Sequence, residues 1–314
     1  MELAAFTAYR NKVVSNCARI IVGKDDVIEK ILVCFLCGGH VLLEDKPGTG
    51  KTMLLRAFAR TLGGDFRRVQ FTPDLLPSDL TGINFYNQKT GDFEFRPGPL
   101  FTSFVLADEI NRATPRTQSA LLEAMEEKQI TVDGVTSRLA EPFMVLATQN
   151  PQESFGTFPL PDAQMDRFFM RLSLGYMTRQ QELEVMARPA AQTMLDQLEP
   201  VVTPDETAYV RTAYHEVRVS DDVKNYLMDI VEATRVQGGF VSGVSTRGTL
   251  ALYQAAQAWA ALQGRDYVIP EDVKGLAPAV LCHRVVLGSS MNAEAAAQRM
   301  RKLLSEITVP LENG

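Results

Sequence analysis

The stretch that decides the fold is Val41-Leu42-Leu43-Glu44-Asp45-Lys46-Pro47-Gly48-Thr49-Gly50-Lys51-Thr52. Three apolar residues lead into a glycine-containing loop, Lys-Thr closes the loop, and residues 52–62 then show the apolar spacing of a helix. This order of strand, loop and helix is the context that a phosphate-binding loop requires. The usual pattern, G-x-x-x-x-G-K-S/T, is broken at its first glycine, which is Asp45 here. A chance strand–turn–helix connection is the alternative, and the strand ends described next argue against it.

Each part of this loop has a chemical role. Gly48 and Gly50 allow backbone N–H groups to face inward around phosphates, next to the partial positive charge of a helix N-terminus. Lys51 is placed to reach the β- and γ-phosphates of ATP, and the Thr52 hydroxyl is placed to coordinate Mg²⁺. We therefore predict ATP and Mg²⁺ as cofactors, with nucleotide contacts from Asp45, Lys46, Pro47, Gly48, Thr49, Gly50, Lys51, Thr52 and Met53.

Two further apolar runs end in polar side chains. Residues 104–107 are followed by Asp108 and Glu109, and residues 143–148 are followed by Gln149 and Asn150. In an open α/β sheet, ligands bind beyond the carboxyl ends of the strands. We predict that Asp108 holds Mg²⁺ with Thr52, that Glu109 polarises the attacking water, and that Asn150 orients this water or touches the γ-phosphate. A plain helix cap after residue 107 is the alternative for the acidic pair.

The remaining pattern indicates an α/β fold: a P-loop core with a parallel sheet flanked by helices, two β-hairpin inserts, and a smaller all-α lid domain. The core should span residues 1–176 and the lid residues 177–314, with inserts at about 82–97 and 128–140. The second insert contains Asp133-Gly134, a strong hairpin signal. Strands are expected at 41–43, 68–72, 104–107, 143–148 and 168–174, and lid helices at 182–186, 222–235, 247–262 and 271–281.

Composition narrows the function. The 314 residues carry a net charge of −6, which disfavours a large contact with a nucleic-acid backbone and makes nucleic-acid binding unlikely. The first residues lack the basic and apolar regions of a signal peptide, and the apolar stretch 31–43 is too short to span a bilayer. We therefore expect a cytoplasmic protein without a membrane span. Cys34 and Cys37 have C-x-x-C spacing, but they end an apolar helical segment and are expected to be inert core residues.

The sequence resembles AAA+ ATPases, and specifically the MoxR family of the helix-2-insert clade. The resemblance covers nearly the whole chain and includes the Asp at position 45, which MoxR relatives commonly carry. Its longest motifs are Phe71-Thr72-Pro73-Asp74-Leu75-Leu76-Pro77-Ser78-Asp79-Leu80-Thr81-Gly82, Ala107-Asp108-Glu109-Ile110-Asn111-Arg112-Ala113, Leu160-Pro161-Asp162-Ala163-Gln164-Met165-Asp166-Arg167-Phe168 and Gly264-Arg265-Asp266-Tyr267-Val268-Ile269-Pro270-Glu271-Asp272-Val273.

The resemblance implies roles that residue spacing alone does not give. Arg167 corresponds to an arginine finger that acts on ATP of the neighbouring subunit, and Arg247 to sensor 2, which contacts the γ-phosphate of its own subunit. Asn150 corresponds to sensor 1, and Val22-Gly23 to the backbone that holds the adenine. On residue type alone, both arginines, like Arg112 and Arg116, would be taken for structural or solvated charges. The two hairpins correspond to the helix-2 and pre-sensor-1 inserts, which tend to face the pore of a ring.

The implied function is that of an Mg²⁺-dependent ATPase, a chaperone-like motor that remodels or activates client proteins. This includes assembly and the insertion of metals or cofactors. The expected partners are further copies of the chain in a ring, a hexamer, and a protein with a von Willebrand factor A domain. The alternatives are a magnesium-chelatase-like motor subunit, a nucleic-acid or transcription AAA+ motor, and a pure nucleotide-binding switch.

Overall fold

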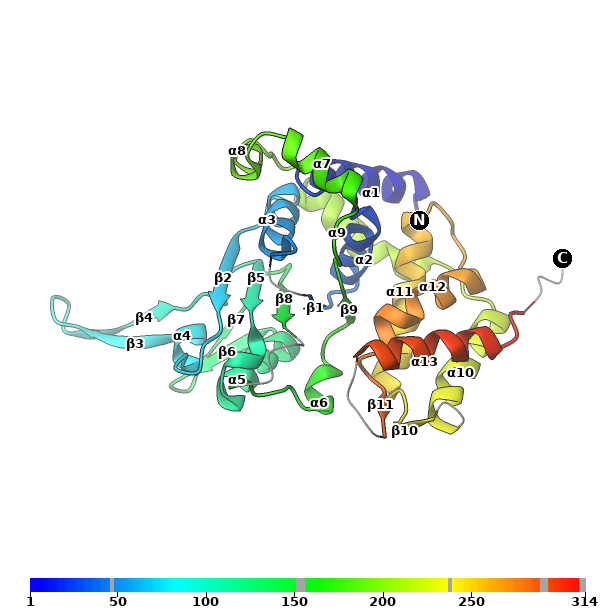
Figure 1. Ribbon diagram of the computed structural model, residues 1–314. Coiled ribbons are helices and arrows are strands. Elements are labelled where there is room, and N and C mark those ends of the chain that lie inside the picture. Colours follow the sequence, from blue (N-terminus) through cyan, green and yellow to red (C-terminus); the bar gives the residue numbers. More distant parts are fainter. Residues whose placement is uncertain (46–47, 151–155, 237–238, 289–292, 311–314) are drawn as a thin grey trace.

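A five-stranded parallel sheet forms the centre of the first half of the chain (Figure 1). The computed structural model describes residues 1–45, 48–150, 156–236, 239–288 and 293–310. The strand order is β2-β5-β8-β1-β9, and every pair is parallel. This confirms the parallel sheet expected from the sequence. The strands are β1 (Val41–Glu44), β2 (Phe66–Gln70), β5 (Phe104–Asp108), β8 (Met144–Gln149) and β9 (Met170–Leu172).

The prediction of residues 68–72 for the second strand was wrong by two positions, because β2 begins at Phe66 and ends at Gln70. β2 is the edge strand of the sheet, and within it only Val69 is buried. The apolar signal that marks the buried strands is therefore weak here. Phe71 still donates its N–H to the Asp108 carbonyl oxygen at 2.8 Å, so the pairing continues one residue beyond the strand.

Alternate residues of the central strands face two different hydrophobic clusters, as the two-residue period of a strand requires. Val41 and Leu43 pack into the larger cluster, whereas Leu42 packs into the smaller one. The larger cluster also contains side chains of α1 (Leu3–Ala18), α2 (Asp25–Leu36) and α3 (Lys51–Thr61). The smaller cluster contains side chains of α4 (Pro77–Thr81) and α5 (Pro115–Glu127). The sheet is thus covered by helices on both faces.

Both expected hairpins form. One is β3 (Gly82–Asn87) with β4 (Asp92–Pro97), which projects from the body of the molecule in Figure 1. The other is β6 (Gln129–Val132) with β7 (Val135–Arg138), joined by Asp133 and Gly134, which both have positive φ angles of 49° and 80°. Asn84 Nδ2 donates to Asp133 Oδ2 at 2.8 Å and so joins the two hairpins.

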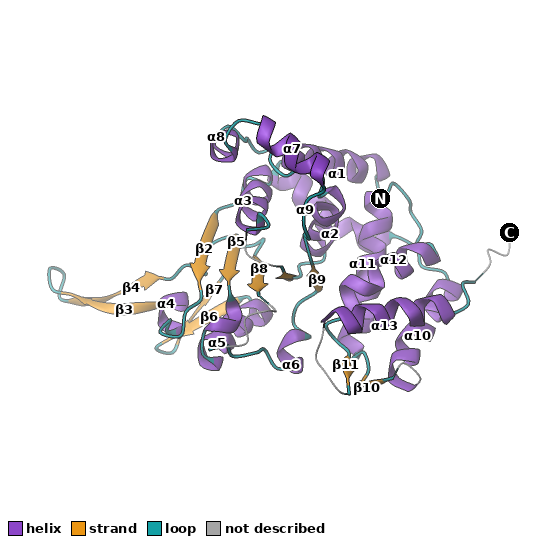
Figure 2. Ribbon diagram, viewed as in Figure 1, coloured by secondary structure: helices purple, strands orange, loops and turns teal. Residues whose placement is uncertain are grey.

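The second half is helical apart from a two-stranded antiparallel pair, β10 and β11, that the sequence did not predict (Figure 2). α8 lies against α3, and α9 lies against α1 and α2. The elements are 3₁₀ helix η1 (Ile110–Arg112), α6 (Asp162–Met165), α7 (Arg179–Ala187), α8 (Ala191–Asp196), α9 (Pro204–Ala213), 3₁₀ helix η2 (Tyr214–Glu216), α10 (Asp221–Val236), β10 (Phe240–Ser242), α11 (Thr246–Leu262), α12 (Pro270–Leu281), β11 (Val286–Leu287) and α13 (Ala293–Glu306).

The larger hydrophobic cluster runs without interruption from the sheet into the helical half. Helix α11 carries small buried side chains along much of its length and packs against α1, α2 and α12. Small side chains allow these helices to approach closely. The boundary expected at residues 176 and 177 is therefore not a gap in the core. Within the described residues, no helix combines the length and the apolar character needed to cross a membrane.

Candidate nucleotide site

The phosphate-binding loop connects β1 to α3 as the sequence predicted. Gly48 and Gly50 have φ angles of 83° and 90°, which favour glycine, and a Cβ atom added to either would meet no atom of the described residues within 4 Å. The loop therefore opens onto free space on this side, as a cradle for phosphates needs. Lys51 Nζ donates to the Asp45 carbonyl oxygen at 2.9 Å. Lys46 and Pro47 lie outside the described residues.

Asp45 is buried and points its carboxylate at the chain that follows β9. The carboxylate accepts hydrogen bonds from Ser173 Oγ at 2.7 Å, from Leu174 N at 2.7 Å and from Gly175 N at 3.0 Å. These bonds fasten the start of the loop to the segment that leads into α7. They also explain why an aspartate occupies a position where glycine is usual. The carboxylate acts as an anchor for the loop, and a nucleotide contact through the Asp45 backbone stays a prediction.

The acidic pair and the end of β8 form one hydrogen-bonded unit. Thr148 Oγ1 donates to Asp108 Oδ1 at 2.7 Å and accepts the Glu109 N–H at 2.8 Å. Glu109 has a left-handed backbone, with φ 58° and ψ 51°, which is uncommon for a residue other than glycine. The strained turn places the two acids in fixed and different directions. Sequence reasoning missed Thr148, whose only signal was a polar residue near the end of an apolar strand.

Side chains from the edge strand β2 hold both acids. Arg68 donates to Asp108 Oδ2 from Nε at 3.1 Å and from Nη2 at 2.7 Å. Gln70 Nε2 donates to Glu109 Oε2 at 2.8 Å, and Arg112 Nε lies 3.1 Å from the same oxygen. Arg112 was expected to be a structural or solvated charge, and its ion pair with the predicted catalytic acid is a structural contact of that kind. None of the β2 contacts was predicted, because they depend on which strand lies beside β5.

The strand order brings the predicted site residues to one edge of the sheet. β8 lies between β1 and β5, so Asn150, directly after β8, is placed between the phosphate loop and the acidic pair. Asn150 is buried, and Thr52 lies in the first turn of α3. Thr52 and Asp108 supply oxygen atoms, which Mg²⁺ prefers, and the open loop fits a phosphate chain. The oxygen donors of Thr52 and Asp108 and the open loop therefore fit Mg²⁺ and a nucleotide.

The segment predicted to hold the adenine lies under α7. Val22 is buried, and Gly23 has a φ angle of 63°. The Gly23 carbonyl oxygen accepts a hydrogen bond from Gln181 Nε2 at 3.3 Å. Gln181 is also part of the capping box at the start of α7. Met53 is partly buried and packs against the larger cluster. A base at Gly23 would thus lie beside α7, a helix that sequence reasoning did not connect with the nucleotide.

The two arginines implied by the resemblance lie together and away from the loop. Arg167 and Arg247 line one cavity of about 540 Å³, which also contains Gly39 and His40. Gly39 and His40 precede β1, whereas the phosphate loop follows it. The four residues of β1 separate the two ends by about 13 Å. The first turn of α11 thus lies near the amino end of β1. The expected contact of Arg247 with the γ-phosphate of its own subunit stays a prediction.

Arg247 has a partner in the core instead. Its Nη2 lies 2.7 Å from Glu126 Oε1 at the end of α5. The N-cap residue Ser245 donates to Asp166 Oδ2 at 3.0 Å, which brings the start of α11 beside α6. Figure 1 shows the lower end of α11 close to α6, whereas the chain between β1 and α3 runs toward the upper part of the view.

His40 and the cysteines are core residues. His40 Nδ1 accepts the Val145 N–H at 3.0 Å, and the Met125 carbonyl oxygen lies 3.1 Å from Nε2. Burial lowers the pKa of His40 from 6.5 to about 4, so the ring is neutral at pH 7. Burial also raises the pKa of the Cys37 thiol to about 12. The four cysteines are free, and the described residues contain no cluster of side chains suited to a metal ion. Cys17, Cys34 and Cys282 are buried and Cys37 is partly buried.

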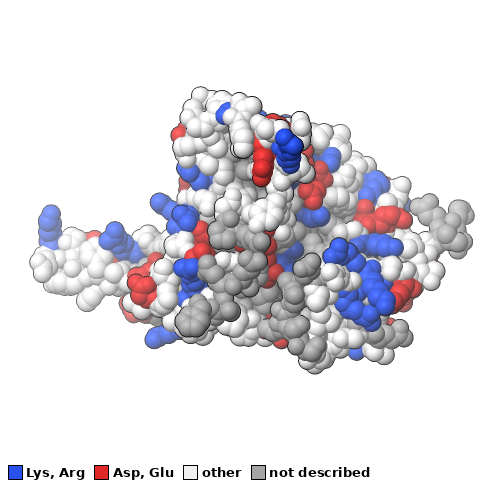
Figure 3. All heavy atoms as spheres, viewed as in Figure 1, with Lys and Arg blue, Asp and Glu red and all other residues white. Residues whose placement is uncertain are grey.

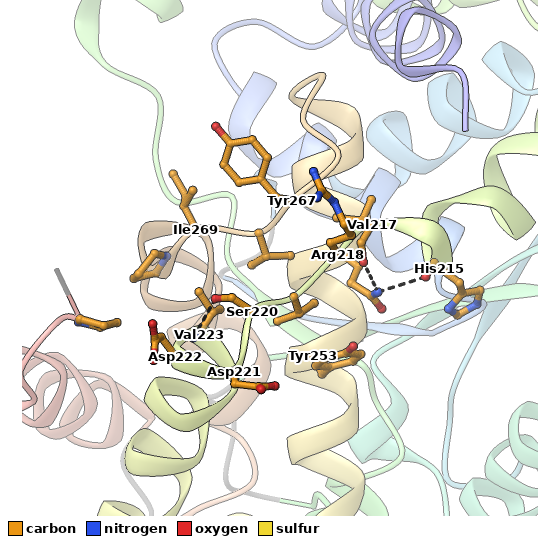
Figure 4. A pocket seen from close by; sticks show the side chains of 15 residues that line it. His215, Val217, Arg218, Ser220, Asp221, Asp222, Val223, Tyr253, Tyr267 and Ile269 are labelled. Atoms are coloured by element: carbon orange, nitrogen blue, oxygen red, sulfur yellow. Dashed lines mark hydrogen bonds between the residues drawn. The ribbon is translucent and has the colours of Figure 1, made fainter. Parts of the chain in front are cut away.

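A larger cavity of about 920 Å³ lies in the helical half, between the starts of α10 and α12 (Figure 4). Two of its polar side chains have partners. Arg218 pairs with Asp266 at 2.8 Å, and the Gln257 amide donates to the carbonyl oxygens of His215 and Val217. It contains none of the residues that the sequence predicted for catalysis. We therefore place the nucleotide site at the edge of the sheet.

Comparison with known proteins agrees with this geometry. Residues 40–170 match the model of the ATPase family associated with various cellular activities (AAA), and residues 232–307 match the AAA lid domain. The chain is 38% identical to the chaperone MoxR1 of Mycobacterium tuberculosis over 331 residues, which cover 99% of this chain and 85% of MoxR1. The chain belongs to the MoxR family of AAA+ ATPases.

Two other similarities cover almost the full length of this MoxR-family ATPase. It is 49% identical over 303 residues to the uncharacterized protein YeaC of Bacillus subtilis, over 96% of this chain and 95% of YeaC. Its fold matches the crystal structure of a protein described as an ATPase from Cytophaga hutchinsonii, with a TM-score of 0.88, 40% identity and 98% of each chain covered. The predicted fold, an α/β core with a helical lid, is thereby confirmed, as is the MoxR assignment.

Proposed function

We propose that this MoxR-type ATPase is an Mg²⁺-dependent motor that works as a ring, a hexamer, and that it remodels or activates client proteins. The observation that carries the proposal is the meeting of the phosphate loop with the Asp108–Thr148–Glu109 unit at one edge of the sheet. An open cradle for phosphates and a fixed acidic pair are the parts that hydrolysis of a phosphoanhydride needs.

In this mechanism Lys51 leaves the Asp45 carbonyl oxygen and contacts the β- and γ-phosphates. Thr52 and Asp108 would hold Mg²⁺, which would supply positive charge beside the phosphates. Glu109 turns from Gln70 and Arg112 toward the attacking water and accepts its proton, while Asn150 orients the water. Thr148 keeps the Glu109 backbone fixed during this side-chain movement.

The arginine positions favour catalysis shared between subunits. Arg167 and Arg247 lie at the amino end of β1, remote from their own phosphate loop. In this arrangement Lys51 is the cation that the subunit itself offers to the phosphates, and the two arginines are free to face the phosphates of another copy. We propose that both arginines act on ATP bound by a neighbour, a head-to-tail contact that closes into a ring. For Arg247 this is an alternative to the contact within its own subunit that the resemblance implies.

The β3–β4 hairpin is the proposed contact with clients. It exposes several large apolar side chains, among them Tyr86 at 54% and Phe93 at 73%, and most of its surface is uncharged in Figure 3. Exposed apolar patches mark sites of protein interaction. We propose that it faces the pore of the ring, in the cytoplasm, and that a protein with a von Willebrand factor A domain is the partner. The comparisons give no better support to a magnesium-chelatase-like or nucleic-acid motor.

The test separates binding from chemistry. Lys51→Ala should lose tight ATP binding, whereas Glu109→Gln should bind ATP and not hydrolyse it. A fluorescent ATP analogue and a phosphate-release assay measure the two properties. Light scattering of Glu109→Gln with ATP should show a ring. Equal ATP affinity of wild type and Lys51→Ala would exclude the phosphate-loop assignment, and a strict monomer at tens of micromolar would exclude the ring.

A second experiment tests the shared site. Arg167→Ala and Lys51→Ala should each be inactive, because one lacks the cation that arrives from the neighbour and the other lacks the phosphate contact. Mixed rings place some intact loops against intact arginines, so hydrolysis should partly return on mixing. A wild-type rate for Arg167→Ala alone would show that Arg167 is only a structural charge.

A further inference from the structure

The cavity that contains Arg167 and Arg247 holds an excess of positive charge. Its charged side chains are four cations and two acids: Lys128, Arg167, Arg247, Arg284, Glu126 and Asp166. Asp166 is paired with the buried Arg284, with Oδ1 2.8 Å from Nε, and Glu126 is paired with Arg247. Among the described residues, no acidic side chain forms an ion pair with Lys128 or Arg167. Such a cavity favours an anion.

Lys128 is held in place by its backbone. It ends α5 with a left-handed φ angle of 52°, its N–H donates to the Ala124 carbonyl oxygen at 3.1 Å, and its own carbonyl oxygen accepts the Leu139 N–H at 2.9 Å. The residue therefore sits at the junction of α5 and the β6–β7 hairpin. A cation on such a fixed backbone needs little reorganisation to meet a ligand.

The Lys128 side chain lies over the turn before β1. A Cβ atom added to Gly38 would be 3.7 Å from Lys128 Nζ and 3.6 Å from Arg211 Nη2. Two like charges thus approach the same small space. Burial lowers the pKa of the adjacent His40, so its ring is uncharged at pH 7. Like charges held together in this way are stabilised when an anion binds.

We infer that Lys128 is a third cation, with Arg167 and Arg247, that contacts the phosphates of ATP bound by the neighbouring subunit. The inference rests on the proposed ring, because the cavity lies away from the chain's own phosphate loop. Lysine suits this place, since an ammonium group is a compact charge that can approach one phosphate oxygen, whereas the two guanidinium groups can each bridge two.

The experiment compares Lys128→Ala with Lys128→Arg and with the control Lys302→Ala, an exposed lysine on α13. Lys128→Ala should lower the ATPase kcat by about tenfold to a hundredfold, as losses of one charge-stabilising donor do. The affinity of the unassembled subunit for ADP should be unchanged, because Lys128 lies away from the phosphate loop of its own subunit. Lys128→Arg should restore most of the rate. A Lys128→Ala rate equal to that of Lys302→Ala would overturn the inference.

Mixing distinguishes a shared site from a structural role. Lys128→Ala has an intact phosphate loop and Lys51→Ala has an intact Lys128, so mixed rings should hydrolyse ATP faster than either variant alone. A fold defect in Lys128→Ala would not be repaired in this way, and absence of recovery would overturn the inference. If Lys128→Ala does not fold, Lys128→Gln takes its place. A wild-type rate for Arg167→Ala would refute the shared site itself, whereas an inactive Arg167→Ala with a fully active Lys128→Ala would refute only the role of Lys128.

Discussion

Replacement of Asp45 by alanine should destabilise the protein by about 3 kcal/mol. Three hydrogen bonds to the carboxylate would be lost, and bonds to a charged group contribute about 1.5–3 kcal/mol each. The loss is smaller than their sum, because Ser173 and Gly175 are exposed and can bond to water. The N–H of Leu174 is buried and would have no replacement, which alone costs about 1–3 kcal/mol.

Urea unfolding of Asp45→Ala against wild type measures this change. The matched control is Asp229→Ala, which removes an exposed carboxylate on α10. Asp45→Asn keeps one acceptor oxygen and should lose about half as much. The affinity for ADP should also fall in Asp45→Ala, because the loop loses its anchor to the chain after β9. A loss below about 0.5 kcal/mol, no larger than that of the control, would refute the role of the three bonds.

Three further outcomes are expected. Lowering the pH from 7 to 5 should reduce the free energy of unfolding by about 2 kcal/mol through His40. Its depressed pKa gives a stabilisation that is complete above pH 6.5 and is lost as the pH falls through about 4. The free energy of unfolding of His40→Gln, measured with urea, should depend less steeply on pH, and an equal slope would contradict this. Glu126→Gln should raise the ATPase rate, because it frees Arg247 from its ion pair. The gain should reach at most about fivefold, since a half-exposed pair contributes at most about 1 kcal/mol. A rate below that of wild type would count against this role of Arg247. Arg68→Gln should bind ATP at a several-fold lower Mg²⁺ concentration than wild type, because the guanidinium of Arg68 occupies Asp108 Oδ2 in the wild type. An equal shift in the Mg²⁺ requirement of Arg67→Gln, on the same strand, would contradict that explanation.

The sequence predicted those parts of the site that local pattern determines. The apolar runs predicted the central strands. The glycine-containing loop after one run pointed to Lys51, and the acidic residues after another pointed to the Asp108–Glu109 pair. Contacts made across the sheet were not predictable in the same way. Arg68 meets Asp108 only because β2 pairs with β5 in a register that aligns Gln70 with Asp108. No neighbouring residue in the sequence indicates that register.

The place of Arg247 shows a second limit. Its motif correctly marks the start of a helix, since Ser245 caps α11 by accepting the Gly248 N–H at 3.2 Å. Where that start lies in the molecule depends on how α11 packs on α1 and α2. This packing is decided by the small buried side chains of α11 together with the larger buried side chains of α1 and α2. Residue type and spacing therefore predicted the helix, and the end of the sheet that it meets had to come from the structure.

The uninterrupted core between the sheet and the helical half has a mechanical consequence. To swing α11 away from α1 and α2, the molecule would have to expose apolar side chains to water, at about 1.5–3 kcal/mol for each large one. A subunit built in this way moves as one rigid body, without a hinge between the sheet and α11. In the proposed ring, movement that follows hydrolysis would then occur at the interfaces between adjacent copies, and a client in the proposed pore would meet whole subunits that shift against each other.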